Sequence, residues 1–525
     1  MAHAAHHIAR AYPPHGRLAS FCAGGESVGE AACEGDEYRD FAFTPLLPTR
    51  LYTAAQVRDN EARAAKEMNI SMPDLMHRAG SAAYELLTFA RREARHITLL
   101  IGKGNNGGDA YIVGQRALEN GLTVHAAQVG DPEKLKGDAL NAYKRFVELG
   151  GVVQPLDEHF VIPSETQAIV DGLFGIGLDR DIAPGPFRRA IEQANAHPSA
   201  LRLAIDIPSG ILADTGKVAG VAFQADVTVT FIACKKGLLT AKAPDYVGRL
   251  YYAPLDVRQA FENLVTCTIE RVSYQSLLRD DRLLALRPMT AHKGSFGKAI
   301  LVGGYKGMPG AIRMAGEACQ RVGAGLVRVV THTQSLAPVA IGRPELMVEG
   351  LDEEVLAQSD RPVVLDADAL NLLADRVVSE PSRTNWVLTP HPGEAARLLG
   401  VSTSEVEQDR FAAARQLQIR YGGVILLKGS GTIVDDGSLV SVVSDGNPGM
   451  GSGGMGDTLT GIITGLLAQG LSPSEAARVG AALHARAADE VASTYGERGM
   501  LATDLLEPLR HLVNPVRRVR LQTDA

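Results

Sequence analysis

The sequence predicts an α/β protein of two domains, each a largely parallel sheet with helices on both faces. Its 525 residues are too many for one hydrophobic core, so two or three domains are expected. Short apolar runs alternate with helical stretches, which is typical of repeated strand–helix units. The alternation stops in a linker-like run near residues 255–275 and then restarts. We therefore place the two domains at residues 49–262 and 263–525.

The first domain is expected to begin with two helices. Thr53 can cap a helix over residues 54–68, and a second amphipathic helix is expected over residues 72–92. Strands are predicted by the apolar runs HITLLIG, TVHAAQVG, AIVDGLFG, LRLAIDIPSG and DVTVTFIA. In the second domain they are predicted by GKAILVGG, GLVRVVT, RPVVLDADAL, NWVLTPH, GGVILLKGSG and LVSVVSD, before helices from Asp457 to about residue 513.

The amino-acid composition indicates which classes of binding partner can be expected. The net charge of −7 disfavours a protein that binds nucleic acid along its phosphate backbone. Only 5% of residues are aromatic and Trp386 is the single tryptophan, so stacking platforms for bases are scarce. The 55 glycines exceed an ordinary usage of about 7% and suit backbone turns that approach a phosphate closely. A pocket for one nucleotide is therefore compatible with this composition, whereas a nucleic-acid partner is not expected.

A membrane partner is not expected either. No run approaches the roughly 18 to 20 apolar residues that cross a bilayer. Residues 1–48 lack hydrophobic periodicity and the apolar core of a signal peptide, so we expect a disordered extension there. A histidine-rich metal site is the alternative for that segment. The five scattered cysteines form no CxxC pair, which is typical of reduced thiols in the cytoplasm.

The clearest motif of the first domain is LLIGKGNNGGDAYIVGQRAL, residues 99–118. A predicted strand runs into the turn Asn105–Asp109, and a helix is expected to open after it. Glycines let the backbone approach a phosphate, and a helix start supplies free N–H groups. The motif is neither a Walker A sequence nor a GxGxxG fingerprint, so a tight structural turn is the alternative.

Two further strand ends of this domain carry polar residues. Asp171 ends one predicted strand, before the glycine-containing loop Gly175–Asp181, while Asp206 and Ser209 end another. Each aspartate alone would also serve as a cap or turn residue. Because the carboxyl ends of parallel strands share one sheet edge, these side chains are expected to meet. Oxygens of Asn106, Asp171 and Ser209 suit a hard cation, and Asp206 is a candidate for proton transfer.

Residues 51–255 resemble the NAD(P)H-hydrate epimerase domain, with YTAAQVRDNE, LMHRAG, GNNGGD, DGLFGIGL, DIPSG and ADVTVTFIACKKGL in the expected order. The resemblance implies a Rossmann-like three-layer fold, a bound K⁺, and interconversion of the R and S epimers at the hydrated nicotinamide carbon. It implies Asp206 as the proton-transfer residue and Asn106, Asp171 and Ser209 as K⁺ ligands. The implied hydrate-binding residues are Asn105, Asn106, Gly107, Gly108, Asp109, Gly175, Ile176, Gly177, Leu178, Asp179, Arg180, Asp181 and Asp206.

The clearest motif of the second domain lies in residues 444–470, where a glycine-rich run leads into Gly456, Asp457 and a predicted helix. Amides at a helix start can hold a phosphoryl group, and an aspartate beside them can act as base on a substrate hydroxyl. A flexible glycine loop is the alternative. Lys428–Thr432 follows another predicted strand and suits a nucleotide phosphate. His391, after a third strand, is either a site residue or a helix cap.

Residues 292–512 resemble the ADP- or ATP-dependent NAD(P)H-hydrate dehydratase domain, through HKGSFG, DADALN, TPHPGE, LKGSGT and GMGDTLTG. The resemblance implies a ribokinase-like fold that phosphorylates the hydrate hydroxyl, with ADP or ATP and Mg²⁺, and then eliminates phosphate. It implies Asp457 as the base and Ala311 and His391 as further hydrate contacts. The implied nucleotide-binding residues are Lys428, Gly429, Ser430, Gly431, Thr432 and Gly456.

One segment departs from that family pattern. Between RPELMVEG and RPVVLDADAL the family carries a further strand and a Gly-Pro-Gly-Leu-Gly loop that contacts the hydrate, whereas this chain has only Leu351–Asp360. Either the dehydration activity is weakened or lost, or the sheet closes in another way.

Together the resemblances imply a bifunctional NAD(P)H-hydrate repair enzyme that acts on NADHX and NADPHX with an adenine nucleotide. A cytoplasmic homo-oligomer is expected. Two alternatives stay open. The second domain would be a small-molecule kinase if its phosphorylated product were retained. The chain would be a non-catalytic scaffold if its fold were reused without chemistry, although Asp206 and Asn105–Asp109 are both present.

Overall fold

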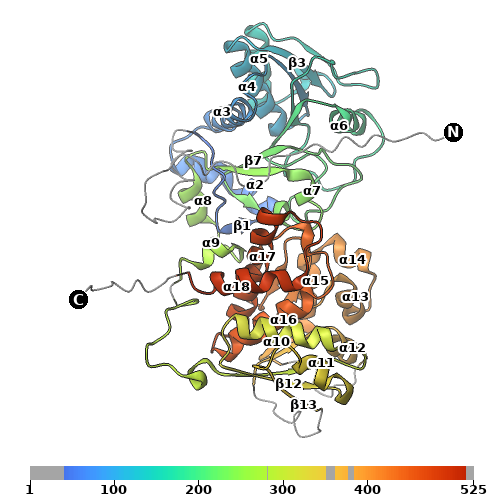
Figure 1. Cartoon of the computed structure of the whole chain (residues 1–525). Coiled ribbons are helices and arrows are strands. Elements are labelled where there is room, and N and C mark those ends of the chain that lie inside the picture. Colours follow the sequence, from blue (N-terminus) through green and yellow to red (C-terminus); the bar gives the residue numbers. More distant parts are fainter. Residues whose placement is uncertain (1–40, 281, 351–360, 376–382, 516–525) are drawn as a thin grey trace, which may run out of the picture.

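The computed structural model describes residues 41–280, 282–350, 361–375 and 383–515. Figure 1 shows two halves stacked end to end, one coloured blue to green and the other yellow to red. Among the described helices, none is both long enough and apolar enough to span a membrane. Cys234, Cys267 and Cys319 are free thiols.

The first half has three layers around a seven-stranded parallel sheet of order β4-β3-β2-β5-β6-β7-β9. The strands are β2 (His96–Ile101), β3 (Thr123–Gln128), β4 (Val153–Pro155), β5 (Ala168–Gly172), β6 (Leu201–Ile205), β7 (Val227–Phe231) and β9 (Arg249–Ala253). Chain order reverses between the neighbours β2 and β5. Ligands of such sheets bind beyond the carboxyl ends of the strands at this switch point.

Helices cover both faces of this sheet. One face packs under α2 (Ala54–Glu67), α3 (Met72–Ala90), α4 (Asn105–Glu119) and α5 (Gly137–Glu148), and the other under α6 (Pro186–Ala196). Thr53 caps α2 by accepting a hydrogen bond from the Gln56 amide, as predicted. The five strands and two helices predicted for this half are all present.

The ordered part of the first half begins earlier than residue 49. Phe43 is 1% exposed, and its ring contacts Phe89 and Tyr251 edge-on. Thr44 forms an antiparallel bridge with Tyr252. Residues 41–48 therefore belong to the packed structure and correct that end of the expected extension, while residues 1–40 lie outside the described residues.

An eight-stranded mixed sheet joins the two halves. Its order is β14-β15-β16-β17-β18-β10-β1-β8, and its last two strands come from the first half. The strands are β1 (Arg50–Tyr52), β8 (Cys234–Lys235), β10 (Ile269–Val272), β14 (Val363–Leu365), β15 (Trp386–Leu388), β16 (Val424–Leu427), β17 (Ile433–Asp435) and β18 (Val440–Val443). One hydrophobic cluster is likewise shared, since it packs Ile207 and Leu238 with Leu388 and Leu427. The predicted division near residue 262 is thus crossed by both the sheet and the core.

Helices cover the second half of this sheet on both faces. α16 (Met455–Ala468) and α17 (Pro473–Tyr495) pack on one face. α12 (Asp368–Ala374), α13 (Pro392–Leu399), α14 (Thr403–Gln408) and α15 (Arg410–Tyr421) pack on the other. The shorter helices are α7 (Pro244–Val247), α8 (Arg258–Leu264), α9 (Tyr274–Leu277), α11 (Leu336–Ala340) and α18 (Leu506–Leu512).

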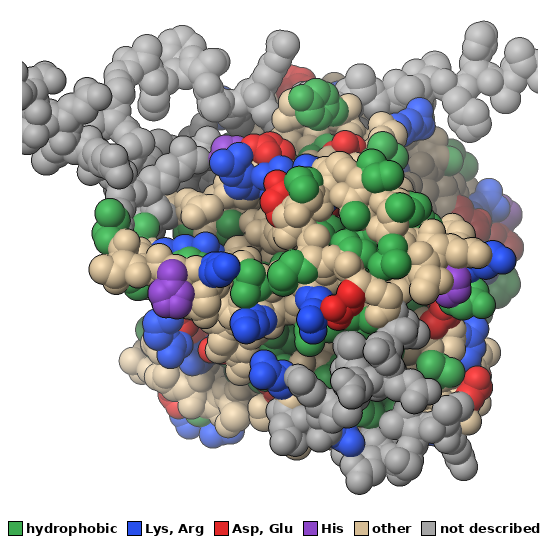
Figure 2. Space-filling model, turned by 60° about the horizontal axis from the view of Figure 1, so that its bottom comes forward, with side chains coloured by type: hydrophobic (Ala, Val, Ile, Leu, Met, Phe, Trp, Pro, Cys, Tyr) green, Lys and Arg blue, Asp and Glu red, His purple; other side chains and the backbone are tan. Residues whose placement is uncertain are grey.

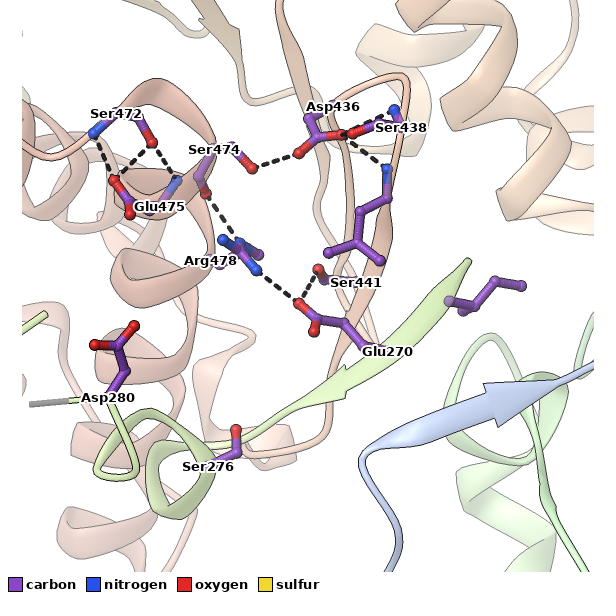
Figure 3. A network of polar contacts seen from close by, with 12 residues as sticks. Glu270, Ser276, Asp280, Asp436, Ser438, Ser441, Ser472, Ser474, Glu475 and Arg478 are labelled. Atoms are coloured by element: carbon purple, nitrogen blue, oxygen red, sulfur yellow. Dashed lines mark hydrogen bonds and ion pairs between the residues drawn. The ribbon is translucent and has the colours of Figure 1, made fainter. Parts of the chain in front are cut away.

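A polar network fixes β10 against β18 and α17 (Figure 3). Glu270 of β10 accepts hydrogen bonds from Ser441 Oγ and Arg478 Nη1, both at 2.8 Å. Nearby, Ser474 Oγ donates to Asp436 Oδ2 at 2.6 Å, so α17 is tied to the turn between β17 and β18. β10, the strand that links the two halves, is therefore held by these side-chain contacts as well as by its backbone hydrogen bonds to the neighbouring strands.

The remaining strands, β11 (Lys298–Val302), β12 (Leu326–Thr331) and β13 (Met347–Gly350), form a separate parallel sheet. Its buried face packs under α10 (Pro309–Arg321). Its other face exposes Ile300, Val302 and Met347, although parallel sheets are usually covered on both faces. Figure 2, viewed from this end of the molecule, shows exposed apolar side chains among lysines and arginines.

The break between the two sheets coincides with the unusual segment of the sequence. Among the described strands, no ladder joins β13, which ends at Gly350, to β14, which begins at Val363. The predicted gap in the family pattern, Leu351–Asp360, lies outside the described residues. The alternative in which the sheet closes in another way is not seen in the part of the chain that the structure describes.

Candidate active sites

The Asn105–Asp109 motif forms the first turns of α4, which begins at Asn105 and not after Asp109 as expected. Gly107 and Gly108 serve packing, because a side chain at 107 would collide with the Gly102 carbonyl and one at 108 would lie 2.6 Å from Met76 Sδ. Gly104, the N-cap just before this motif, has no atom within 4 Å of the position that a Cβ would take. Tertiary packing of α4 on its neighbours thus offsets the low helix propensity of this segment.

Asp206 directly follows β6 and has a φ of +64°, a strained conformation for a residue other than glycine. Its Oδ1 atom accepts hydrogen bonds from Phe231 N at 3.1 Å, Thr230 Oγ1 at 3.2 Å and the ammonium group of Lys235. Lys235 is 1% exposed. No described residue donates to Oδ2 of Asp206, so this oxygen is available to a bound molecule.

Two further carboxyl groups face this ion pair. Asp109, in α4, and Glu61, in α2, are both close enough to Asp206 for its charge to act on them. Burial and then Asp206 raise the pKa of Glu61, while burial, Asp206 and Glu61 raise the pKa of Asp109 well above its ordinary value. The site therefore gathers three carboxyl groups around one buried lysine.

The sequence analysis assigned no role to Glu61 or Lys235. A signal for Lys235 was present, since a charged residue directly follows the buried run VTVTFIAC. Glu61 gave no comparable signal, because one glutamate on an amphipathic helix usually lies on its solvated face.

The predicted cation ligands do meet at the switch point. Ser209 donates from its amide to Asp171 Oδ2 at 2.7 Å and from its hydroxyl to Asp171 Oδ1 at 2.6 Å. Asn106 Nδ2 donates to the Phe174 carbonyl at 2.8 Å, and Phe174 N donates to Ser209 Oγ at 2.9 Å. Burial raises the pKa of Asp171 to about 6, and no described cationic side chain pairs with it.

The loop Gly175–Asp181 is only partly at this site. A Cβ at Gly175 would lie 3.5 Å from Asn106, which places the start of the loop beside the cation ligands. Asp179, Arg180 and Asp181 are exposed farther along. A cavity of about 370 Å³ opens at the N-terminus of α4. Its lining includes Asn105 and three lysines, Lys103, Lys134 and Lys136.

The second site lies at the start of α16. Gly454 adopts a φ of +90° and α16 begins at Met455, so Gly456 and Asp457 lie in its first turn. A Cβ at Gly456 would lie 3.4 Å from Lys428 Nζ. α10 packs on α16, with Met314 against Gly454, which brings the helix of Ala311 to the same glycine loop.

Charged groups surround Asp457. Lys428 Nζ lies 2.8 Å from Asp366 Oδ1 and 3.8 Å from Glu394 Oε2, and Thr460 Oγ1 donates to Asp366 Oδ2 at 2.8 Å. Burial and then Asp366 raise the pKa of Asp457, whereas Lys428 opposes this shift. A carboxyl group whose pKa is moved towards neutrality is better suited to accept a proton there.

His391 caps α13, which was the alternative kept open for it. Its Nδ1 accepts hydrogen bonds from Gly393 N at 3.0 Å and Glu394 N at 3.3 Å. In return, Glu394 accepts a hydrogen bond from the His391 amide at 2.8 Å. The cap leaves the imidazole half exposed on the side that carries Glu394 and Lys428.

The sequence matches two family models. One, described as YjeF-related protein N-terminus, covers residues 73–237. The other, described as NAD(P)H-hydrate dehydratase, matches in two pieces, residues 299–359 and 350–511. The two matched pieces overlap at residues 350–359, in the segment where the sequence departs from the family pattern.

Curated relatives match along most of the chain. It is 41% identical to the bifunctional NAD(P)H-hydrate repair enzyme Nnr of Escherichia coli (strain K12) over 499 positions, which cover 89% of this chain and 95% of that protein. It is 44% identical to the enzyme of the same name from Vibrio cholerae serotype O1, with coverage of 89% and 99%. Since 89% of 525 residues is about 467, about 30 positions of the E. coli protein lie opposite gaps in this chain.

Solved structures match about half of the chain. A ribokinase-like superfamily protein from Enterococcus faecalis is 29% identical, covers 48% of this chain and 98% of its own, and has a TM-score of 0.42. The ADP/ATP-dependent NAD(P)H-hydrate dehydratase from Bacillus subtilis, co-crystallised with ATP and Mg²⁺, is 26% identical, covers 45% and 96%, and has a TM-score of 0.40.

Proposed function

This chain belongs to the family of bifunctional NAD(P)H-hydrate repair enzymes, and from that membership we propose which residues carry its two reactions. The first half is the epimerase, which equilibrates R- and S-NAD(P)HX. The second half is the dehydratase, which uses ADP or ATP to return S-NAD(P)HX to NAD(P)H. The observation that supports these assignments most directly is that each half holds one aspartate, Asp206 or Asp457, beside a glycine-rich helix start.

Asp206 is proposed as the proton-transfer residue of the epimerase. Inversion at the hydrated carbon requires one of its bonds to break and to form again on the other face. Either the hydroxyl leaves as water and water adds back, or the bond to the ring nitrogen opens to an aldehyde and closes again, and in both routes a proton moves on or off the oxygen. Three donors on Oδ1 fix the carboxylate and leave Oδ2 to make this transfer. Lys235 is a positioning residue that holds the group in its strained conformation.

Binding of the hydrate in the first half is proposed along the start of α4. Asn105–Asp109 and the loop Gly175–Asp181 would border it, with Gly104 leaving room for a phosphate at the helix N-terminus. The three lysines of the adjacent cavity supply positive charge for the phosphate groups of the dinucleotide.

Asn106, Asp171 and Ser209 are proposed to hold K⁺. The buried Asp171 carboxylate has no cationic partner among the described residues, and an ion there would supply the missing positive charge. Carboxylate, amide and hydroxyl oxygens are the donors that a hard cation takes. When bound, K⁺ would neutralise this charge and fix the three side chains beside the hydrate.

Asp457 is proposed as the base of the dehydratase. It takes the proton of the hydrate hydroxyl as that oxygen attacks the terminal phosphorus of ADP or ATP, and AMP or ADP leaves as the P–O bond to it breaks. Phosphate is then eliminated: the C–O bond breaks, the neighbouring ring carbon gives up a proton to solvent, and the ring double bond forms. Amides at the start of α16 would stabilise the transferring group. Ala311 and His391 are proposed to contact the hydrate, while Lys428–Thr432 and Gly456 would hold the nucleotide.

Mg²⁺ is proposed to bind mainly through the nucleotide. Among the described residues no group of three or more His, Cys, Asp or Glu side chains forms a metal cluster, and Mg²⁺ is commonly held by one or two carboxylates plus substrate phosphates. Asp366 and Glu394, both beside Lys428, are the carboxylates placed for this. The ion would neutralise charge on the phosphates.

The test uses the full chain with separated R- and S-NADHX. Without nucleotide, it should interconvert the epimers faster than the spontaneous rate. With ADP or ATP and Mg²⁺, it should convert S-NADHX to NADH, detected by absorbance, and release free phosphate. Absence of epimerisation would refute the first assignment, and a phosphorylated product that accumulates would favour a kinase instead.

A second candidate for the second half is supported by the break between β13 and β14. In that case the half binds nucleotide without completing dehydration, because the substrate loop of the family pattern is missing. Nucleotide binding without NADH formation would select this candidate. We also propose a cytoplasmic location, consistent with the three free thiols, and a homo-oligomer that light scattering of the purified chain would test.

A further inference from the structure

The loop Lys428–Thr432, called here the nucleotide loop, is anchored by hydrogen bonds from side chains to its backbone carbonyls. Arg410 Nη2 donates to the carbonyls of Leu427 and Lys428, both at 3.2 Å, and Thr432 Oγ1 donates to the Gly429 carbonyl at 3.0 Å. Arg410 is 2% exposed, so this guanidinium lies inside the protein and not in solvent.

The carbonyls of Ser430 and Gly431 in this loop accept a hydrogen bond from the other half of the chain. Thr240 Oγ1 lies 3.1 Å from the Ser430 carbonyl and 3.0 Å from the Gly431 carbonyl, and its single proton is shared between them. Thr240 is fully buried and follows the short 3₁₀ turn η2 (Lys236–Leu239). Lys236 in that turn lies 4.2 Å from the ring centroid of Phe411, next to Arg410.

Gly431 is shaped for this contact. Its φ is +59°, and a Cβ there would collide with the Leu239 carbonyl and lie 2.7 Å from Thr240 Cα. The two halves therefore meet backbone to backbone at this point. A glycine is needed at 431 both for its left-handed conformation and for the close approach of the first half.

The backbone carbonyls of the nucleotide loop accept hydrogen bonds, whereas four of its amides donate none to the described residues. The carbonyls of Leu427 to Gly431 all accept side-chain hydrogen bonds, as described above. The amides of Gly429, Ser430, Gly431 and Thr432 donate to no other described residue. A row of unpaired amides on an anchored backbone is the arrangement that binds phosphate oxygens.

We propose that Thr240, a residue of the epimerase half, is a positioning residue of the dehydratase half that orients the nucleotide loop towards the phosphates of ADP or ATP. The proposal depends on the proposed nucleotide site and adds a requirement that the halves be in contact. Loss of the Thr240 hydroxyl leaves the Ser430 and Gly431 carbonyls without the donor that the first half supplies, so the loop is no longer fixed in its position towards the nucleotide.

The experiment compares Thr240→Val with Thr240→Ser in the full chain. Valine keeps the shape and removes the donor, whereas serine keeps the donor. The matched control is Thr228→Val, because Thr228 is also fully buried in the first half but donates to the Val247 carbonyl at 2.7 Å and not to the nucleotide loop. ADP affinity is measured by calorimetry with Mg²⁺, alongside kcat and KM for dehydration and the epimerisation rate.

Thr240→Val should weaken ADP binding and raise its KM by about twofold to tenfold, as expected for the loss of one hydrogen bond that positions the loop. Its kcat and epimerisation rate should stay near those of the parent, Thr240→Ser should bind like the parent, and Thr228→Val should not alter ADP affinity. Should Thr240→Val fail to fold, Thr240→Cys, a weaker donor of similar size, takes its place.

Unchanged ADP affinity in the Thr240 variant, or an equal loss in Thr228→Val, would overturn the proposal. Failure of the proposed nucleotide site gives a different result, since the parent chain itself would then bind neither ADP nor ATP.

Discussion

Lys428 Nζ lies 2.8 Å from Asp366 Oδ1, and both charges act on the carboxyl group of Asp457. Lys428 favours the ionised form of Asp457, while Asp366 and burial oppose it. Whether Asp457, the proposed base, is protonated therefore depends on these three opposing effects. A substitution that removes one of them should change the pKa of Asp457.

Asp366→Asn should move the acid limb of the dehydration pH profile to lower pH. The base acts when ionised, and activity falls as the pH drops through its pKa. Asp457 has its pKa raised above the ordinary 3.8, so the parent limb should lie above that value. Removal of the Asp366 charge removes one cause of the shift and also frees Lys428 to act on Asp457. The measurement is kcat/KM for S-NADHX between about pH 4 and 8, a range that begins near the ordinary carboxyl pKa of about 4. The control is Asp368→Asn, an exposed neighbour, and a limb that rises in Asp366→Asn would contradict the prediction.

Asp206→Asn should lower epimerisation by about a hundredfold or more, the usual contribution of a positioned acid–base group. Dehydration of pure S-NADHX should persist, because Asp457 lies in the other half. Asp226→Asn breaks a comparable ion pair, with Arg202 at 2.9 Å in the same half, and serves as the control. Epimerisation at the parental rate in Asp206→Asn would refute the assignment.

Lys235→Met should destabilise the fold by about 3–5 kcal/mol, because it leaves the Asp206 charge buried and unpaired. The double variant Lys235→Met/Asp206→Asn should recover much of this loss, since both charges are gone, yet remain inactive as an epimerase. Urea unfolding measures the stability, and epimer interconversion measures the activity. A double variant that is no more stable than Lys235→Met would show that the lysine acts through packing alone.

Potassium should stabilise the first half through Asp171. The melting temperature should be higher in KCl than in tetramethylammonium chloride at equal ionic strength, because an ion that binds only the folded state stabilises it by mass action. Asp171→Asn should abolish that difference. A difference that survives in Asp171→Asn would place the ion elsewhere.

Phe43→Ala should cost about 3–5 kcal/mol of unfolding free energy, the usual cost of deleting a buried aromatic side chain. Phe43 is 1% exposed, whereas Leu46 in the same segment is 51% exposed. Leu46→Ala should therefore change stability by no more than about 0.5 kcal/mol. Equal losses of stability in the two variants would show that residues 41–48 are not part of the packed structure and belong to the expected disordered extension.

The sequence by itself determined the repeated strand–helix pattern, the family, and the glycine-rich segments that lie at the starts of α4 and α16, although α4 begins at Asn105 and not after Asp109 as expected. These features are local: alternation of apolar runs, glycines before a helix, and Asp206 or Asp457 at a strand end or helix start follow from short-range rules. That Asp171 and Ser209 would meet was also predictable, because parallel strands bring their carboxyl ends to one edge.

Tertiary structure alone decided which charges pair and where the halves touch. Lys235 reaches Asp206 from a different strand, Lys428 reaches Asp366 over 62 positions, and Thr240 reaches the nucleotide loop over about 190. β1 joins a sheet whose other strands come mostly from the second half. These are long-range pairings, set by the free energy of burying whole faces against each other, and no periodicity within a single segment encodes them.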